Sequence, residues 1–437
     1  MKISDLVSSL VNASEKAATI ARTVRSEHAL FQLLVEEKEG DQKNKRFFKD
    51  FKTLGDVLIQ EVVRHDVGNQ FSGLAHHILG EESNHFTNVL GDTIEVAVQP
   101  SQEQTSALLG KSKVLDGQGD AASLLAKVVH ENVKVAPHVK LATLEAEIPT
   151  EKVGVWIDPI DSTYQYISGK EGTTDTHNII NKGLPCVTVL IGAFDRQTGK
   201  PIVGVINQPF VTLDEVNSRF PRCVWFPPTS ITLQSPNIVE LLMSLLSPSP
   251  QLNIFNSIAG AGFKSLCVVK HQGCAYILSP PTTFKWDTCA PQAILSALGG
   301  GIVNYQDGLK LVKESANISD DDLTEELSKL QIRYDRPDAS AAGTGQPWCN
   351  TGGLLAYTQS KDLLAILLNP ISNIFSYYCV VIENLLSCNA IYNSVRLYYQ
   401  VWLKDYSIPC TLYILFIIEV FIKDDLQKAV VFNSIPR

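Results

Sequence analysis

Two aspartates in the segment WIDPIDST, residues 156–163, have the type and spacing to bind a cation. Asp158 and Asp161 are three residues apart in an apolar stretch. Burying one unpaired carboxylate is costly, and two carboxylates at close range repel each other. Pro159 restricts the backbone, so a sharp turn after Asp158 can direct both carboxylates and the Ile160 carbonyl to one point. Hard divalent cations take such oxygens as ligands, so the segment predicts a Mg²⁺ site with more than one ion.

Four further acidic residues can take part in the same chemistry. They are Asp56, Glu81, Glu82 and Asp287. Each acidic residue also has a plain structural interpretation. Asp56 follows Thr53 at the spacing of a helix capping box, and the two glutamates fit a solvated turn. Asp161 and Asp287 both fit the N-cap of a helix, which is a common use of aspartate. Residue types alone leave both interpretations open.

The residues that follow these aspartates can bind an anion. Ser162 and Thr163 open a predicted helix, and backbone N–H groups at a helix start suit a phosphate. A second candidate is AGAGFKS, residues 259–265, where glycines allow close backbone approach and Lys264 supplies charge. The segment does not match a nucleotide P-loop, because Phe263 precedes the lysine. The nine histidines show no HxxH or HExxH spacing, which disfavours a zinc site.

Alternating strands and helices are expected to position these groups. Five β-rich runs cover 153–157, 186–194, 201–210, 266–270 and 274–278. Helical patterns cover 1–66 in two amphipathic stretches, 121–140, and 288–298 before three glycines. This alternation predicts a layered α/β arrangement. Asp158 is expected at the end of the 153–157 strand, and ligands of open α/β sheets bind at strand ends.

Composition limits the partners and the compartment. The chain has 437 residues, of which 45% are hydrophobic and 19% charged, as in ordinary soluble globular proteins. Its net charge of −9 argues against bulk binding of nucleic acid or an anionic membrane. Nine cysteines without a CxxC pair indicate reduced thiols in a cytoplasmic protein.

Three segments stand apart from this pattern. Residues 408–422 are apolar, but they are shorter than the roughly 20 residues of a membrane span and contain Glu419, so we expect no span. Residues 212–255 are rich in proline and serine and are expected to form loop. Residues 361–437 show weak periodicity, and no role is assigned to them.

The order D…GEE…DPIDST…WDxxA resembles the magnesium-dependent, lithium-inhibited phosphatases, which include inositol monophosphatase, fructose-1,6-bisphosphatase and the bisphosphate nucleotidases. The resemblance covers about residues 5–210 and 254–358. It implies an α/β fold, in the form of a layered αβαβα sandwich. We expect an N-terminal α+β domain over 1–190 with most metal ligands, and a C-terminal α/β domain over 191–360 with an atypical segment at 211–254. The divergent tail, 361–437, has no counterpart in the family.

The resemblance also implies a role for each candidate residue. Glu81, Asp158 and the Ile160 carbonyl would hold one Mg²⁺, while Asp158, Asp161 and Asp287 would hold a second, with Glu82 beside the metals. Asp56 and Thr163 would orient and deprotonate the attacking water. Contacts to the inositol phosphate would come from Ser162, Thr163, Gly260, Ala261, Lys264 and Thr282. Two ions arranged in this way suit an in-line displacement at phosphorus.

Several stretches are most similar to the branch of the family that acts on inositol polyphosphates, among them FKTLGDVLIQEV, GVINQPF and TTFKWDTCA. This similarity implies removal of the 1-phosphate from inositol 1,4-bisphosphate and inositol 1,3,4-trisphosphate by a cytoplasmic monomer. One alternative is a sister phosphatase for a bisphosphate nucleotide or an inositol monophosphate. A second, of another class, is a non-catalytic or unstable form that only binds ligand. The atypical segment and the tail motivate this second alternative.

Overall fold

The computed structural model describes residues 1–26, 35–38, 50–88, 90–111, 119–134, 146–174, 179–211, 223–226, 258–273, 275–314, 319–341 and 346–359. All of them belong to one compact unit, residues 1–370. Among these residues no helix is both long and apolar enough to cross a membrane. The apolar run 408–422 and the tail 361–437 lie outside the described residues.

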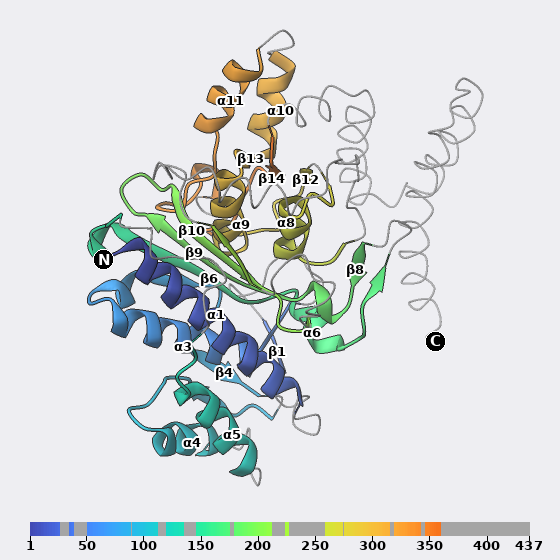
Figure 1. Ribbon diagram of the computed structural model, residues 1–437. Coiled ribbons are helices and arrows are strands. Elements are labelled where there is room, and N and C mark those ends of the chain that lie inside the picture. Colours follow the sequence, from blue (N-terminus) through green and yellow to red (C-terminus); the bar gives the residue numbers. More distant parts are fainter. Residues whose placement is uncertain are drawn as a thin grey trace, which may run out of the picture. The chain divides into compact units, whose positions relative to one another are not determined.

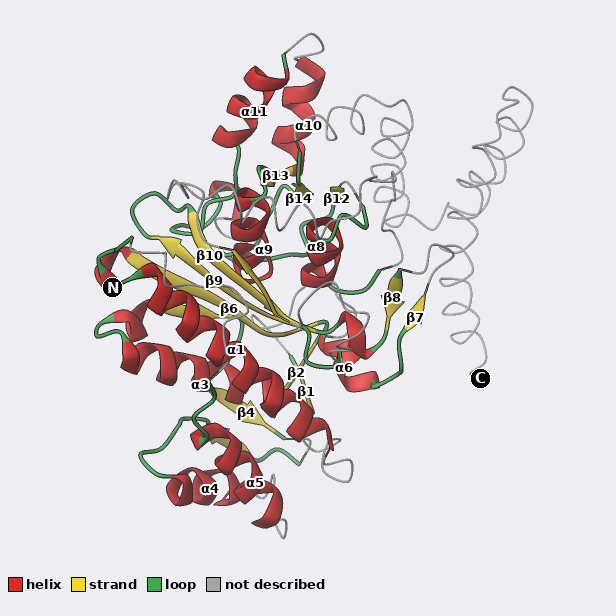
Figure 2. Cartoon of the chain, viewed as in Figure 1, coloured by secondary structure: helices red, strands yellow, loops and turns green. Residues whose placement is uncertain are grey.

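A five-stranded mixed sheet forms the centre of the unit (Figure 2). Its order is β11 (Cys223–Phe226), β10 (Pro201–Asn207), β9 (Thr188–Asp195), β6 (Val153–Asp161) and β3 (Ile78–Gly80). Neighbouring strands are antiparallel except β3 and β6, which run parallel. Every residue of β6 is buried, so this strand carries its side chains into the protein on both faces.

Helices cover both faces of this sheet, and a second sheet follows (Figure 1). On one face lie α1 (Ile3–Ser26) and α3 (Leu54–Gln70), and on the other α8 (Ala261–Val269) and α9 (Lys285–Ala297). Beyond α8 and α9 lies an antiparallel sheet in the order β12 (Ala275–Leu278), β14 (Leu354–Tyr357) and β13 (Gly301–Asn304). Outermost are α10 (Tyr305–Glu314) and α11 (Asp320–Lys329). These five layers confirm the expected αβαβα sandwich.

The remaining elements are short or peripheral. They are β1 (Val35–Glu37), β2 (Phe51–Thr53), β4 (His85–Thr87), β5 (Thr93–Glu95), α4 (Gln102–Lys111), α5 (Gly119–His130), α6 (Thr163–Ser168), β7 (Thr173–Thr174), β8 (Ile180–Lys182) and the 3₁₀ turns Leu74–His77, Thr150–Lys152, Leu184–Cys186 and Ala339–Ala341. Strands β1 and β2 pair with each other beside the start of α3. Helix α6 follows directly on β6.

Two facing glycines let α9 lie directly against the large sheet. Gly192 on β9 is opposite Gly204 on β10. A β-carbon at Gly192 would lie 2.5 Å from the backbone nitrogen of Ala290, and one at Gly204 would lie 2.1 Å from the Ala290 carbonyl oxygen. No real side chain fits at such distances. The glycines therefore set how closely α9 approaches the sheet, and with it the position of Asp287 at the start of the helix.

The structure corrects several local predictions. Residues 266–270, expected as a strand, belong largely to α8, because a short apolar run buried between two sheets looks the same in either conformation. Strand β6 does not end at Asp158 but continues to Asp161. Helix α9 begins at Lys285, three residues before the predicted start. Part of the predicted loop at 212–255 is strand β11, and the rest of that segment lies outside the described residues. The predicted domain boundary at residue 190, which lies within β9, stays a prediction.

Candidate metal centre and substrate pocket

A cavity of about 680 Å³ opens where β6, α8 and α9 meet. Of the predicted site residues, those that line it are Glu81, Glu82, Asp158, Ile160, Asp161, Ser162, Thr163, Gly260, Ala261, Lys264, Thr282 and Asp287. Asp56 does not line the cavity and lies behind it with an exposed fraction of 1%. Residues separated by more than 200 positions in the sequence are thus brought to one place, although their roles stay predictions.

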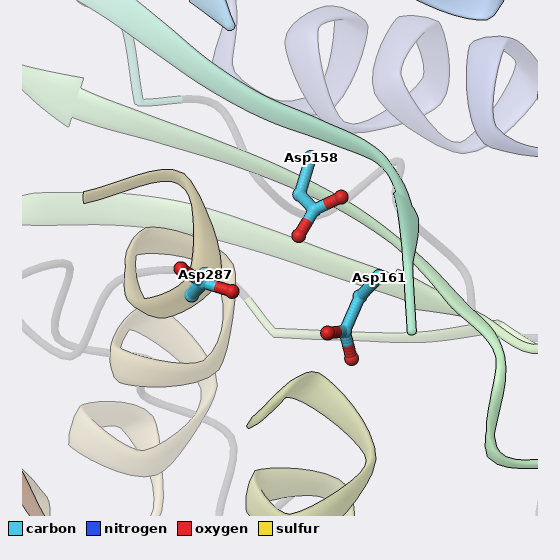
Figure 3. A group of neighbouring side chains, drawn as sticks. All are labelled: Asp158, Asp161 and Asp287. Carbon is cyan, nitrogen blue, oxygen red and sulfur yellow. The ribbon is translucent and has the colours of Figure 1, made fainter. Parts of the chain in front are cut away.

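Three carboxylates that line this cavity converge on one another (Figure 3). Asp158, Asp161 and Asp287 each offer an oxygen within 4.8 Å of the others. The first two come from β6 and the third from the first turn of α9. Because they are held close together, they can bind a divalent ion jointly.

A bulge in β6 explains how the two aspartates of WIDPIDST point the same way. In a regular strand, residues three apart face opposite sides of the sheet. Here Asp158 pairs with Leu190 of β9, and Asp161 pairs with Thr188, so β6 contains one residue more than its partner between these points. Because of this extra residue, Asp158 and Asp161 point to the same side of the sheet. Pro159 lies within this irregularity, where a missing backbone N–H does not break a regular ladder.

Hydrogen bonds occupy some of the carboxylate oxygens and leave others for a ligand. One oxygen of Asp161, Oδ2, accepts from Thr188 Oγ1 at 3.0 Å and from the Gly262 N–H at 2.9 Å. Asp287 Oδ2 accepts from the Phe284 N–H at 2.6 Å. Asp158 Oδ1 is buried and has no hydrogen-bond partner among the described residues. A buried carboxylate oxygen without a hydrogen-bond partner, on a side chain that lies close to two other carboxylates, fits a bound cation.

Burial and mutual repulsion disfavour the charged forms of these groups. Burial raises the pKa of Asp158 well above its usual value, and the charges of Glu81, Asp161 and Asp287 raise it further. The pKa of Asp287 is also raised well above its usual value, first by burial and then by the charges of Asp161 and Glu81. A divalent cation between the carboxylates would remove this penalty.

Lys38 is a site residue that the sequence did not reveal. Its Nζ lies 2.6 Å from Glu81 Oε1 and 2.6 Å from Glu82 Oε1, and its exposed fraction is 3%. Burial opposes the charge of Lys38, but Glu81, Glu82 and Asp50 outweigh it and hold the lysine pKa well above its usual value. Burial also raises the pKa of Glu82 to about 8, against the opposing charge of Lys38. No local spacing could have signalled this contact, because 43 positions separate Lys38 from Glu81.

Asp56 forms a capping box with Thr53 at the start of α3, as its structural interpretation predicts. Its Oδ2 accepts from the Thr53 N–H at 2.7 Å and from Thr53 Oγ1 at 2.6 Å. Burial raises the pKa of Asp56 to about 7, although the hydrogen bonds from Thr53 oppose the shift. Thr163 Oγ1 donates to the Ile160 carbonyl at 3.1 Å. Within the described part of the chain no hydrogen bond joins Asp56 to Thr163, and their expected joint role on the attacking water stays a prediction.

The groups expected to hold phosphate lie beside the carboxylates. Ser162 has a φ of 70°, which is unusual for a residue with a side chain, and its Oγ is buried without a partner in the described structure. Gly260 comes so close that a β-carbon there would lie 2.3 Å from this Oγ. Lys264 Nζ lies 5.1 Å from the centre of the Tyr276 ring. Burial lowers the pKa of Lys264, and the charges of Asp161 and Asp287 counter that effect.

Aromatic side chains form part of the cavity lining, and Phe284, Trp286 and Trp348 are together called the aromatic wall. Phe284 and Trp286 stack with ring centres 4.5 Å apart and an angle of 3°. Trp156, behind the wall, contacts both Trp286 and Trp348. Trp286 and Trp348 line the cavity, so a ligand there meets aromatic side chains as well as acidic groups. The sequence reasoning missed this wall, and the tryptophan beside Asp287 was the one local signal.

Comparisons with known proteins agree with the motifs. The model of the inositol monophosphatase family matches residues 6–220 and 234–334. The chain is 43% identical over 397 residues to inositol polyphosphate 1-phosphatase of Bos taurus, covering 83% of this chain and 96% of that protein. Identity to the Homo sapiens protein of the same name is 41% over 407 residues, covering 85% and 98%. A weaker match, 30% over 177 residues, links the chain to 3'(2'),5'-bisphosphate nucleotidase 1 of Mus musculus and covers 36% and 51%.

Proposed function

Because the chain belongs to the inositol monophosphatase family and is a phosphatase, we propose that it uses Mg²⁺ to remove the 1-phosphate from inositol 1,4-bisphosphate and inositol 1,3,4-trisphosphate. Lithium inhibition is part of the proposal. The observation that carries it is the convergence of Asp158, Asp161 and Asp287, which each offer an oxygen within 4.8 Å of the others. Asp158 also has a buried oxygen, Oδ1, without a hydrogen-bond partner among the described residues. The family is metal-dependent, and oxygen donors of this kind suit Mg²⁺ better than zinc or copper.

The acidic residues divide between two proposed ion positions. Glu81, Asp158 and the Ile160 carbonyl would hold one ion, and Asp158, Asp161 and Asp287 would hold the other. Glu82 would lie beside them. When bound, such ions supply positive charge that stabilises the reacting phosphate and favours loss of a proton from water at neutral pH. Asp158 is shared, so its loss would affect both positions.

The chain's own residues would orient the reactants. In this proposal Asp56 and Thr163 align the attacking water and accept its proton. The Ser162–Thr163 turn, Gly260, Ala261, Lys264 and Thr282 would contact the inositol phosphate. The residues that would contact the phosphate line one cavity of about 680 Å³, which is within the range of small-molecule sites. The net charge of −9 supports a small-molecule enzyme without nucleic-acid or membrane partners, and we propose a cytoplasmic monomer.

The direct test measures phosphate release from inositol 1,4-bisphosphate by the full chain. Three conditions are compared: Mg²⁺, Mg²⁺ with Li⁺, and chelator. We expect release that needs Mg²⁺ and falls with Li⁺. Parallel assays with inositol 1-phosphate and a 3',5'-bisphosphate nucleotide identify the substrate class, since the family match leaves these sister activities as the main alternatives. Folded protein without release from any of the three would overturn the proposal.

Two variants connect that activity to the site. Asp158→Asn should reduce release to background, because it weakens a ligand shared by both ions. Asp195→Asn is the matched control: Asp195 ends β9 and accepts from the N–H groups of Gln197 and Thr198, and it does not line the cavity. Thr163→Ala should slow release while Mg²⁺ still stabilises the protein. Equal rates for Asp158→Asn and the parent would disprove the metal assignment.

A further inference from the structure

Gln60 contacts the acidic turn from behind the cavity. It lies on α3, one helical turn after Asp56, and its exposed fraction is 0%. The Glu82 N–H donates to Gln60 Oε1 at 2.9 Å, and Gln60 Nε2 donates back to the Glu82 carbonyl at 2.5 Å. The side-chain oxygen and nitrogen of Gln60 therefore both form hydrogen bonds with the main chain of Glu82.

Gly80 makes room for this contact. A β-carbon at Gly80 would lie 2.0 Å from Gln60 Oε1 and 2.6 Å from Cδ, so the Gln60 amide would have to move away from its present position. Gly80 does not have a positive φ, so glycine here leaves space for the Gln60 amide rather than allowing an unusual backbone conformation. The Gly80–Glu82 segment and Gln60 therefore form one fitted unit.

The turn is also fixed on its other side. The Glu81 N–H donates to the Ile157 carbonyl at 3.2 Å, which extends the pairing of β3 with β6. Because β6 also carries Asp158, the turn is tied to the strand on one side and to α3 on the other. The Glu81 and Glu82 carboxylates are then presented to the cavity from a backbone with little freedom to move.

From this geometry we propose that Gln60 is a positioning residue that sets the affinity of the site for divalent ions by fixing the main chain of Glu82. The inference rests on the proposed metal-dependent function and adds to it a residue outside the predicted set. Groups that orient metal-binding side chains typically change metal affinity or activity by about 10–100-fold when they are lost. Gln60 lies outside the cavity lining, so it would act through Glu82 and not on the substrate directly.

The main test replaces Gln60 by methionine, which is similar in size but makes neither hydrogen bond. Gln60→Met should raise the Mg²⁺ concentration for half-maximal phosphate release by about 10-fold or more, with a smaller change in the rate at saturating Mg²⁺. Amide hydrogen exchange of the peptide around Glu82 should become faster in metal-free protein. The Mg²⁺ concentration that gives half of the thermal stabilisation should rise in parallel, and this readout needs no activity.

Gln292→Met is the matched control. Gln292 is also fully buried and also uses both amide atoms, on the Ile332 carbonyl at 3.1 Å and the Tyr334 hydroxyl at 2.6 Å. It does not contact the acidic turn. Its replacement should lower stability without shifting the Mg²⁺ midpoint, which separates a positioning role from a general packing role.

Gly80→Ala provides a second route if Gln60→Met folds poorly. The added methyl should expel the Gln60 amide and raise the Mg²⁺ midpoint in the same way. In a Gln60→Ala background, Gly80→Ala should raise the Mg²⁺ midpoint much less, because the added methyl no longer meets the Gln60 amide. A responsive parent with an unshifted midpoint in Gln60→Met and Gly80→Ala would overturn this inference alone. A parent without any response to Mg²⁺ would overturn the proposed function and the inference together.

Discussion

At the scale of single residues, Lys38 supplies the positive charge that Glu81 and Glu82 need in metal-free protein, since its Nζ lies 2.6 Å from each. Lys38→Met should lower the free energy of unfolding by about 3–5 kcal/mol in chelator, because the buried Glu82 carboxylate and the partly buried Glu81 carboxylate lose their counter-ion. Added Mg²⁺ should recover part of that loss, because the ion supplies charge at the same carboxylates. Urea unfolding in chelator and in Mg²⁺ measures both quantities.

Lys16→Met is the control for this prediction. Lys16 is buried like Lys38, and its Nζ lies 2.6 Å from Asp66 Oδ2, away from the cavity. Its loss should destabilise the protein equally with and without Mg²⁺. If Mg²⁺ did not reduce the stability lost in Lys38→Met, the lysine and the ion would not act on the same carboxylates.

Ser162 offers a second test at this scale, because its φ of 70° is left-handed. Alanine is usually more favourable than glycine by about 0.5–1 kcal/mol, but left-handed backbone reverses that preference. We therefore expect Ser162→Gly to be more stable than Ser162→Ala. Ser8, in the middle of α1, should show the ordinary order, with alanine above glycine. Thermal or urea unfolding of the four variants gives the comparison, and the same order at both positions would contradict the backbone argument.

At the scale of elements, the glycine pair under α9 links sheet packing to the acidic site. Gly192→Ala should destabilise the protein by about 1–3 kcal/mol and raise the Mg²⁺ concentration needed for activity, since the helix must move and carries Asp287 with it. Gly110→Ala, in the open part of α4, meets only Ala122 at 3.8 Å and should stabilise by up to about 1 kcal/mol. Urea unfolding measures the stability of both variants. A Gly192→Ala variant as stable as the parent would refute the close contact between α9 and the large sheet.

The same scale shows which elements the sequence could predict. Strands β9, β10 and β12 follow from β-rich runs of limited length, and α1 and α3 follow from amphipathic periodicity. Helix α8 was mistaken for a strand because its apolar residues are buried on all sides, which removes the periodicity. The bulge in β6 was also missed, because a bulge depends on pairing with β9 and not on the local sequence.

At the scale of the whole described unit, the five layers and the acidic constellation could be inferred from ordered motifs, whereas long-range contacts could not. Lys38 meets Glu81, and Gln60 meets Glu82, only after folding, since 43 positions separate the first pair and 22 separate the second. Asp287 was predictable by its motif, but its distance from Asp158 depends on the layer that α9 occupies.

Because the clustered carboxylates come from the large sheet and from α9, a bound ion would join two layers and should stabilise the unit as a whole. At a free Mg²⁺ concentration of 100 times Kd, the free energy of unfolding should rise by about 2.7 kcal/mol for one site that is absent from the unfolded chain. Urea unfolding in Mg²⁺ is compared with chelator plus NaCl at the same ionic strength. Asp158→Asn should lose most of the increase while Asp195→Asn keeps it. Equal unfolding midpoints for the parent in Mg²⁺ and in chelator would mean that no ion binds between β6 and α9.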